Sequence, residues 1–311
     1  MKKNILITGI GGEIGQGISL LLKKYFPNFK IFGTDCHKRH SGKIFVKNLL
    51  QLPKVSDKQY FNKFSKILKN KKIDIIIPTS ENEIQYFNKI RRKIELQKFI
   101  LPSPNLIEIG SQKIKTFDFL KSNNLKRPWT LRINEFKKIK NFPCILKPNM
   151  GRGSKHNLIC KNIFEAKLYS KIKKNFIFQE LLKPSSKEIT CAVYRFQDGR
   201  IKIIQLLRQL KGGYTSWAKV LKDKQIDKMC RTIAEKINFF GPANFQMIYT
   251  NKGPIIFEIN ARFSSTVYLR DALGFTDLLW CVKEKLKIKT KTFKPISNRE
   301  IARFDKVKFL D

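Results

Sequence analysis

Short apolar runs alternate with helix-type spacing in the first hundred residues. Three runs have the composition of buried strands, and the last of them is nearly continuous in β-branched residues: 4–8, 30–33 and 73–78. Two stretches between the runs have the apolar spacing of helices: 18–25 and 60–68, the second with Ser56-Asp57 as its start signal. This alternation predicts a doubly wound α/β domain over residues 1–104, where prolines interrupt the pattern.

The pattern changes after residue 104. Residues 105–183 hold short elements and a small glycine loop at 151–154, whereas longer strand-type runs follow Pro184: 188–196, 201–207, 244–249 and 254–259. A helix with apolar positions between Ile226 and Ile237 separates them. Turn sequences at 198–199 and 251–253 indicate antiparallel pairing. Residues 105–311 therefore form a predicted α+β domain.

The chain carries 64 Lys and Arg against 24 Asp and Glu, a formal net charge of +40. Such a charge could serve a polyanionic partner, because neutralising phosphates releases counterions. However, the basic residues are mostly lysines spread along the chain, and they accompany abundant Ile, Asn and Phe, a composition that AT-biased coding can produce. We interpret the charge as a generally basic surface and do not expect a nucleic-acid partner.

Six cysteines are scattered without a C-x-x-C pair, which is typical of reduced thiols in a cytosolic protein. The longest charge-free stretch, 237–251, includes Pro and Asn and is too short to span a bilayer. We therefore expect a cytoplasmic protein without a membrane partner.

A glycine cluster, Gly9-Ile10-Gly11-Gly12-Glu13-Ile14-Gly15-Gln16-Gly17, lies between the first strand and its helix, and Asp35 follows the second strand. It fits a dinucleotide site with Asp35 on the ribose. Tyr169 and Lys173 have the spacing of a proton relay, which would make the chain an NAD(P)-dependent oxidoreductase or a nucleotide-sugar epimerase. Both signals are weak in a lysine-rich chain, because such glycine loops also occur as tight turns.

A second motif, Phe257-Glu258-Ile259-Asn260-Ala261-Arg262, ends a predicted strand. The period of two places Glu258, Asn260 and Arg262 on one face. Carboxylate and amide oxygens suit Mg²⁺, and a guanidinium suits a transferring phosphoryl group. Gln246, across the predicted hairpin turn, could supply another oxygen. The structural alternative is a salt bridge between Glu258 and Arg262.

A third motif, Cys144-Ile145-Leu146-Lys147-Pro148-Asn149-Met150-Gly151-Arg152-Gly153-Ser154, presents a lysine on a buried strand before a glycine loop. The lysine charge and the loop amides could contact phosphates. About thirty residues on, 176–182 form a strand that ends beside Glu180, and Glu188 starts the next strand. That connection could bind an adenine edge and a ribose.

The order of these motifs resembles the ATP-grasp superfamily, most closely one synthetase half of the carbamoyl-phosphate synthase large chain and its stand-alone carboxylate–amine ligase relatives. The resemblance implies a pre-ATP-grasp domain over 1–104 and an ATP-grasp domain over 105–311, with a lid at about 128–183. It implies ATP contacts at Lys113, Lys147, Gly153, Ser154, Glu180, Leu181, Leu182 and Glu188. It also implies metal ligands at Gln246, Glu258 and Asn260, and a phosphate-facing Arg262.

The implied activity is an ATP-dependent ligase that activates a carboxylate as an acyl phosphate and couples it to an amine. ATP and Mg²⁺ (or Mn²⁺) are the implied cofactors, with Arg262 and Lys147 offsetting charge on the transferred phosphoryl. Small-molecule carboxylate and amine substrates are the expected partners, and a homodimer is left open. We place the substrates beside a larger set of residues: Gly11, Gly12, Ser80, Glu81, Arg208, Thr215 and Ser216. A helix cap explains Ser80 equally well.

Overall fold

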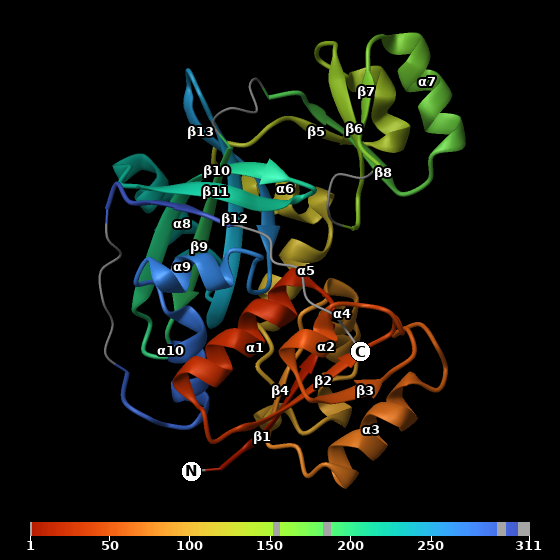
Figure 1. Ribbon diagram of the computed structural model, residues 1–311. Coiled ribbons are helices and arrows are strands. Elements are labelled where there is room, and N and C mark those ends of the chain that lie inside the picture. The colour runs from red at the N-terminus through yellow and green to blue at the C-terminus, as the bar shows by residue number, and fades with distance from the viewer. Residues whose placement is uncertain (1, 152–155, 183–187, 291–296, 304–311) are drawn as a thin grey trace.

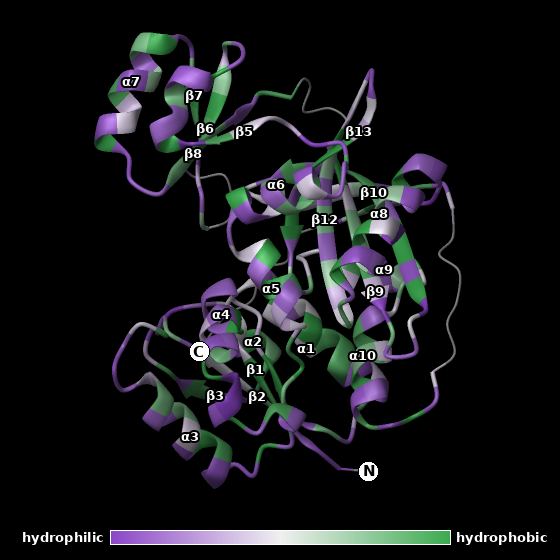
Figure 2. Cartoon of the chain, turned by 180° about the vertical axis from the view of Figure 1, so that it is seen from behind, coloured by the Kyte–Doolittle hydropathy of each residue, from purple (hydrophilic) through white to green (hydrophobic). Residues whose placement is uncertain are grey.

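The computed structural model describes residues 2–151, 156–182, 188–290 and 297–303. Three sheets make up the architecture, and Figure 1 shows them as a lower, a central and an upper body. The view from behind in Figure 2 has the same order. None of the described helices combines the length and apolar composition needed to cross a membrane.

The N-terminal sheet has four parallel strands in the order β3-β2-β1-β4. They are β1 (Asn4–Thr8), β2 (Lys30–Asp35), β3 (Asn48–Gln51) and β4 (Ile75–Ile77). Successive residues of β1 enter different cores: Ile5 and Ile7 lie in the cluster that contains α1, whereas Leu6 lies with aromatic residues of α3 and α4. Helices therefore cover both faces, and the predicted doubly wound α/β domain is confirmed.

Six helical segments lie within the N-terminal domain, between residues 13 and 98. They are α1 (Glu13–Tyr25), α2 (Gly42–Phe45), α3 (Tyr60–Asn70), α4 (Glu81–Lys89) and two short 3₁₀ turns, η1 (Arg91–Lys93) and η2 (Leu96–Lys98). Helix α1 begins earlier than the apolar pattern predicts, because the glycine-rich residues 13–17 already form its first turn. Helices α5 (Pro104–Ser111) and α6 (Lys113–Ser122) then lead toward the central sheet.

The central sheet has six strands in the order β13-β12-β9-β10-β11-β14, all paired antiparallel. They are β9 (Glu188–Arg195), β10 (Ile201–Lys211), β11 (Tyr214–Leu221), β12 (Gly241–Thr250), β13 (Gly253–Asn260) and β14 (Glu300–Ala302). The turns predicted at 198–199 and 251–253 connect β9 to β10 and β12 to β13. Strand β11 was not among the predicted strands.

Opposite faces of the central sheet pack against different helices. Helix α8 (Lys224–Ile237) buries its apolar side against one face. The other face shares a core with α1, α9 (Val267–Ala272) and α10 (Asp277–Lys285), in which Ile18 of α1 joins Leu206 of β10 and Trp280 of α10. Helix α1 thus packs between the N-terminal and central sheets, which fixes the glycine cluster beside the central sheet.

The third sheet, in the order β5-β8-β6-β7, is the upper body of Figure 1. It contains β5 (Thr130–Arg132), β6 (Cys144–Pro148), β7 (Leu158–Cys160) and β8 (Phe176–Glu180), with η3 (Ile133–Lys138) and α7 (Ile163–Ile172). Leu146 and Phe178 are fully buried beneath these helices. The alternate residue Lys147 consequently projects from the other side of β6.

All six cysteines are free thiols, and five of them are buried. Cys36, at the end of β2, is the partly exposed one. No disulfide therefore contributes to this fold.

Candidate active site

The oxygen-bearing side chains proposed as metal ligands lie on two neighbouring strands. Gln246 of β12 is directly opposite Glu258 of β13, and the register places Asn260 opposite Asn244. Opposed residues of an antiparallel pair project to the same face, so Gln246, Glu258 and Asn260 form one polar surface. The hairpin predicted from residues 251–253 produces this register.

Arg262 follows β13 and connects the central sheet to the N-terminal body. Its Nε and Nη2 atoms donate to Glu81 Oε1 over 3.0 and 2.7 Å, and Nη2 also donates to Asn260 Oδ1 over 3.0 Å. The alternative of a Glu258–Arg262 salt bridge is wrong, because Glu81 is the acid that the guanidinium contacts. Among the described residues, no hydrogen bond or ion pair involves the Glu258 carboxylate.

Lys147 approaches the same surface from the third sheet. Its ammonium donates to Gln179 Oε1 over 2.9 Å and lies 5.1 Å from the centre of the Phe257 ring on β13. Gln179 is itself buried and donates to Thr130 Oγ1 over 3.0 Å. Burial lowers the pKa of Lys147 to about 8, although the charge of nearby Glu258 opposes that shift. A lysine that faces a carboxylate in a confined site is suited to an anionic ligand.

The start of α6 completes the floor of this site. Lys113 donates from Nζ to the Gly151 carbonyl over 3.1 Å, and its backbone amide donates to the Asn149 carbonyl over 2.9 Å. Asn149 also accepts the Ile114 amide through Oδ1 over 3.0 Å. One pocket is lined by residues from four parts of the chain: Glu81, Lys113, Asn149, Gly151, Glu258 and Asn260 among them.

The residues proposed for adenine and ribose occupy the connection between the third and central sheets. Glu180 ends β8, and its Oε2 atom accepts the Trp129 amide over 3.2 Å. Leu181 and Leu182 are half-buried beyond it. Glu188 begins β9 and pairs with Arg208 of β10, whose side chain is only 7% exposed. Gly153 and Ser154 lie outside the described residues.

The remaining substrate candidates are more dispersed. Thr215 is fully buried, and its hydroxyl has no partner among the described residues. Ser216 donates from Oγ to the Gln209 carbonyl over 3.3 Å. Ser80 caps α4 by accepting the Glu83 amide over 3.3 Å, which confirms the capping interpretation. Its own hydroxyl donates to the Glu83 carboxylate over 2.6 Å.

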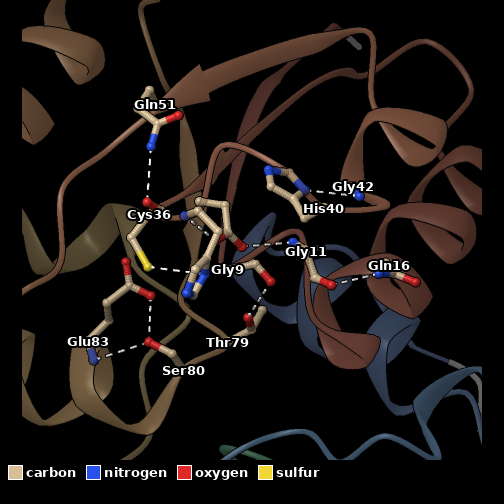
Figure 3. Close-up of polar contacts among 12 residues, drawn as sticks. Gly9, Gly11, Gln16, Cys36, His40, Gly42, Gln51, Thr79, Ser80 and Glu83 are labelled. Atoms are coloured by element: carbon tan, nitrogen blue, oxygen red, sulfur yellow. Dashed lines mark hydrogen bonds and ion pairs between the residues drawn. The ribbon is translucent and has the colours of Figure 1, made fainter. Parts of the chain in front are cut away.

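The glycine loop is tightly packed around its own polar contacts (Figure 3). Gly9 has a φ of +66°, and a Cβ atom there would lie 2.7 Å from Thr79 Oγ1. The Gly11 amide donates to Asp35 Oδ2 over 2.9 Å. Burial alone would raise the pKa of Asp35, but hydrogen bonds from the His37 and Gly11 amides lower it below its ordinary value. Asp35 and Gly11 are therefore already hydrogen-bonded to each other.

Gly12 caps the N-terminus of α1 in an extended conformation, and a Cβ atom there would meet no atom closer than 3.5 Å. It is thus more open than its neighbours. Tyr169 and Lys173 lie on or beside α7 in the upper body, far from this loop in both Figure 1 and Figure 2. The described residues therefore do not bring the predicted proton relay to the glycine loop.

Comparison with family models agrees with this arrangement. Residues 110–266 match the ATP-grasp domain, and residues 5–100 match the PylC-like N-terminal domain. Because the first match spans just over half of the chain, the protein belongs to the ATP-grasp family. The predicted superfamily is confirmed. The predicted fold, in which an α/β domain precedes an α+β ATP-grasp domain along the chain, is confirmed as well.

Individual relatives are ATP-grasp enzymes. The chain is 25% identical over 291 residues to the tyramine–L-glutamate ligase of Methanocaldococcus jannaschii, covering 90% of this chain and 81% of that one. N5-carboxyaminoimidazole synthetase from Staphylococcus aureus, solved with ADP, superposes with a TM-score of 0.75 at 17% identity, covering 94% and 80%. Biotin carboxylase from Campylobacter jejuni, in a complex with β,γ-ATP, gives a TM-score of 0.72 at 14% identity, covering 93% and 72%.

These comparisons confirm the predicted class of ATP-dependent ligase, and none supports the oxidoreductase or epimerase alternative. Three contributors to the site were missed from the sequence. Asn149 ties the third sheet to α6, Gln179 orients Lys147, and Arg303 contacts the start of α1. The partners of these two amides and the arginine come from other segments of the chain, so only the fold reveals their roles.

Proposed function

We propose that this chain is a carboxylate–amine ligase that binds MgATP between Lys147 and the Gln246–Glu258 surface. The observation that carries the proposal is the placement of a lysine from the third sheet opposite a carboxylate of the central sheet that has no hydrogen-bond or ion-pair partner in the described part of the chain. We further propose that the carboxylate substrate is an amino acid of the L-glutamate type and the nucleophile a primary amine, as the name of the tyramine–L-glutamate ligase suggests.

Gln246, Glu258 and Asn260 would hold the Mg²⁺ ion (or Mn²⁺). Their donor set fits a hard cation, since it consists of one carboxylate and two amide oxygens on a single face. When bound, the metal would polarise the phosphate oxygens. A single carboxylate neutralises only part of its charge, so we expect metal binding to depend on the phosphates of the nucleotide.

The protein groups hold and neutralise the reacting phosphates. Lys147, held by Gln179, and Arg262, held by Glu81, are positioned to offset charge that develops on the transferred phosphoryl group. A carboxylate oxygen of the substrate attacks the γ-phosphorus while the bond to ADP breaks, which gives an acyl phosphate. The amine then attacks the acyl carbon, phosphate leaves with the bonding electrons, and the amine loses one proton.

We assign separate roles to the lid, to the connection between the third and central sheets, and to the N-terminal domain. Residues 128–183 would act as the lid, and the loop at 151–154, with Gly153 and Ser154, would exclude water from the acyl phosphate. Glu180, Leu181, Leu182 and Glu188 would contact the adenosine. Gly12 and Glu81 would border the organic substrate.

Substitution of Glu258 tests the proposal. Glu258→Gln retains shape but removes the charge, and we expect ADP formation from MgATP, L-glutamate and tyramine to fall to background. Glu235→Ala is a matched control, because that glutamate is exposed on α8, which covers the opposite face of the sheet. Wild-type turnover by a folded Glu258→Gln protein would show that the metal face is assigned wrongly.

A further inference from the structure

Arg303 joins three segments that are distant in the sequence. Its guanidinium pairs with Glu13 in the first turn of α1 and donates from Nη2 to the Ser265 carbonyl over 2.9 Å. It also lies 5.2 Å from the centre of the Tyr214 ring, and its backbone amide donates to the Ser216 carbonyl over 2.8 Å. The guanidinium is therefore held from several sides.

This position borders the proposed substrate side of the site. Glu13 directly follows Gly12, and Ser265 lies three residues after Arg262. Arg303 thus lies between the glycine loop and the segment that follows the phosphate-facing arginine. It also lies beyond both segments that match family models, which end at residues 100 and 266.

Because the guanidinium pairs with the Glu13 carboxylate, a carboxylate is a group that this position can bind. A guanidinium presents paired donors in a fixed plane that matches a carboxylate. The two side chains are 22% and 37% exposed, although the Oε2 atom through which Glu13 contacts Arg303 is itself buried. A partly exposed ion pair contributes little to stability, and the Ser265 carbonyl and the Tyr214 ring would keep the guanidinium in place if Glu13 moved away.

We propose that Arg303 is a specificity-determining residue that binds a non-reacting carboxylate of the organic substrate, and that Glu13 occupies this place when the substrate is absent. The proposal rests on the proposed ligase function and deepens it. The proposed substrate is an amino acid. If one of its carboxylates is activated and a second is held by Arg303, it is a dicarboxylic amino acid. The enzyme should then prefer L-glutamate to L-glutamine and to 4-aminobutyrate.

Four variants separate binding from a structural role. Arg303→Ala should raise the KM for L-glutamate about ten- to a hundred-fold, the cost of a lost charge-assisted contact, with the KM for MgATP nearly unchanged. Arg303→Lys should restore part of the affinity. Glu13→Gln should lower the KM for L-glutamate several-fold, because it removes the competing carboxylate. Arg299→Ala is the matched control, since Arg299 is an exposed arginine of the same segment.

The sign of the Glu13→Gln effect is decisive. If the ion pair only joined the two bodies, Glu13→Gln and Arg303→Ala would both lower the melting temperature, and neither would improve the affinity for L-glutamate. That result would overturn the proposal, as would an unchanged KM in Arg303→Ala.

Direct binding separates this proposal from the ligase function. Thermal shifts with a non-hydrolysable ATP analogue and L-glutamate, compared with L-glutamine, report binding without turnover. A glutamate-specific shift that disappears in Arg303→Ala, without ADP formation by the wild type, would support the Arg303 site and refute the ligase reaction with this substrate. ADP formation that is equally efficient with L-glutamine and L-glutamate would support the ligase and refute the role of Arg303.

Discussion

The lowered pKa of Lys147 predicts that the enzyme takes up protons when it binds nucleotide. Without ligand, burial places this pKa at about 8. Nearby phosphates favour the charged ammonium and should return the pKa toward or above the ordinary lysine value of about 10.4. At pH 8 about half of the free enzyme carries a neutral Lys147, so binding should take up about 0.5 proton. The uptake should fall to about 0.1 at pH 7 and rise to about 0.9 at pH 9.

Calorimetry in buffers of different ionisation enthalpy measures this number. The slope of the observed binding enthalpy against the buffer ionisation enthalpy gives the protons taken up when an ATP analogue binds with Mg²⁺. Lys147→Arg keeps a charge that does not titrate in this range, so its slope at pH 8 should be close to zero. A zero slope for the wild type at pH 8, or an undiminished slope in Lys147→Arg, would refute the reasoning.

Two further predictions concern stability. Gly15→Ala should destabilise the protein by about 1–3 kcal/mol in urea unfolding, because the added Cβ would lie 2.7 Å from the Gly9 carbonyl oxygen. Gly12→Ala, with 3.5 Å to its nearest atom, is its control and should shift unfolding by less than about 0.5 kcal/mol; equal effects would contradict the steric explanation. Asp277→Ala should cost about 3–5 kcal/mol, because it leaves the guanidinium of Arg270, 1% exposed, without its buried acid. A cost below about 1 kcal/mol, measured the same way, would show that this pair is not a structural centre.

Local sequence patterns predicted much of the fold because the relevant contacts are local. The turn at 251–253 fixes the register of β12 and β13, and this register alone places Gln246 opposite Glu258. Strand β11 was missed because its pairing with β10 is interrupted by a bulge and its first residues follow two glycines. The spacing of apolar residues therefore did not indicate where this strand begins.

The partners of the charged site residues could not be predicted, because they come from distant segments. Glu81 and Arg262 are 181 positions apart and meet only because α4 lies beside the end of β13. The same holds for Glu13 and Arg303. The glycine motif shows that a local pattern can also mislead. Its spacing fits a dinucleotide site, but Asp35 and His40 fill the space next to Gly11.

Because five cysteines are buried and one is partly exposed, a single thiol can be labelled in the native protein. Cys36 alone is partly exposed, and it lies beside the glycine loop, with Sγ 3.5 Å from His37 Nδ1. Burial raises the pKa of the Cys36 thiol, so alkylation should be slow at neutral pH and faster under alkaline conditions. A maleimide dye would therefore label the native enzyme at a single place, beside the glycine loop. Loss of the fold would release five more reactive thiols, so counting labels by mass would distinguish a local rearrangement around this loop from global unfolding.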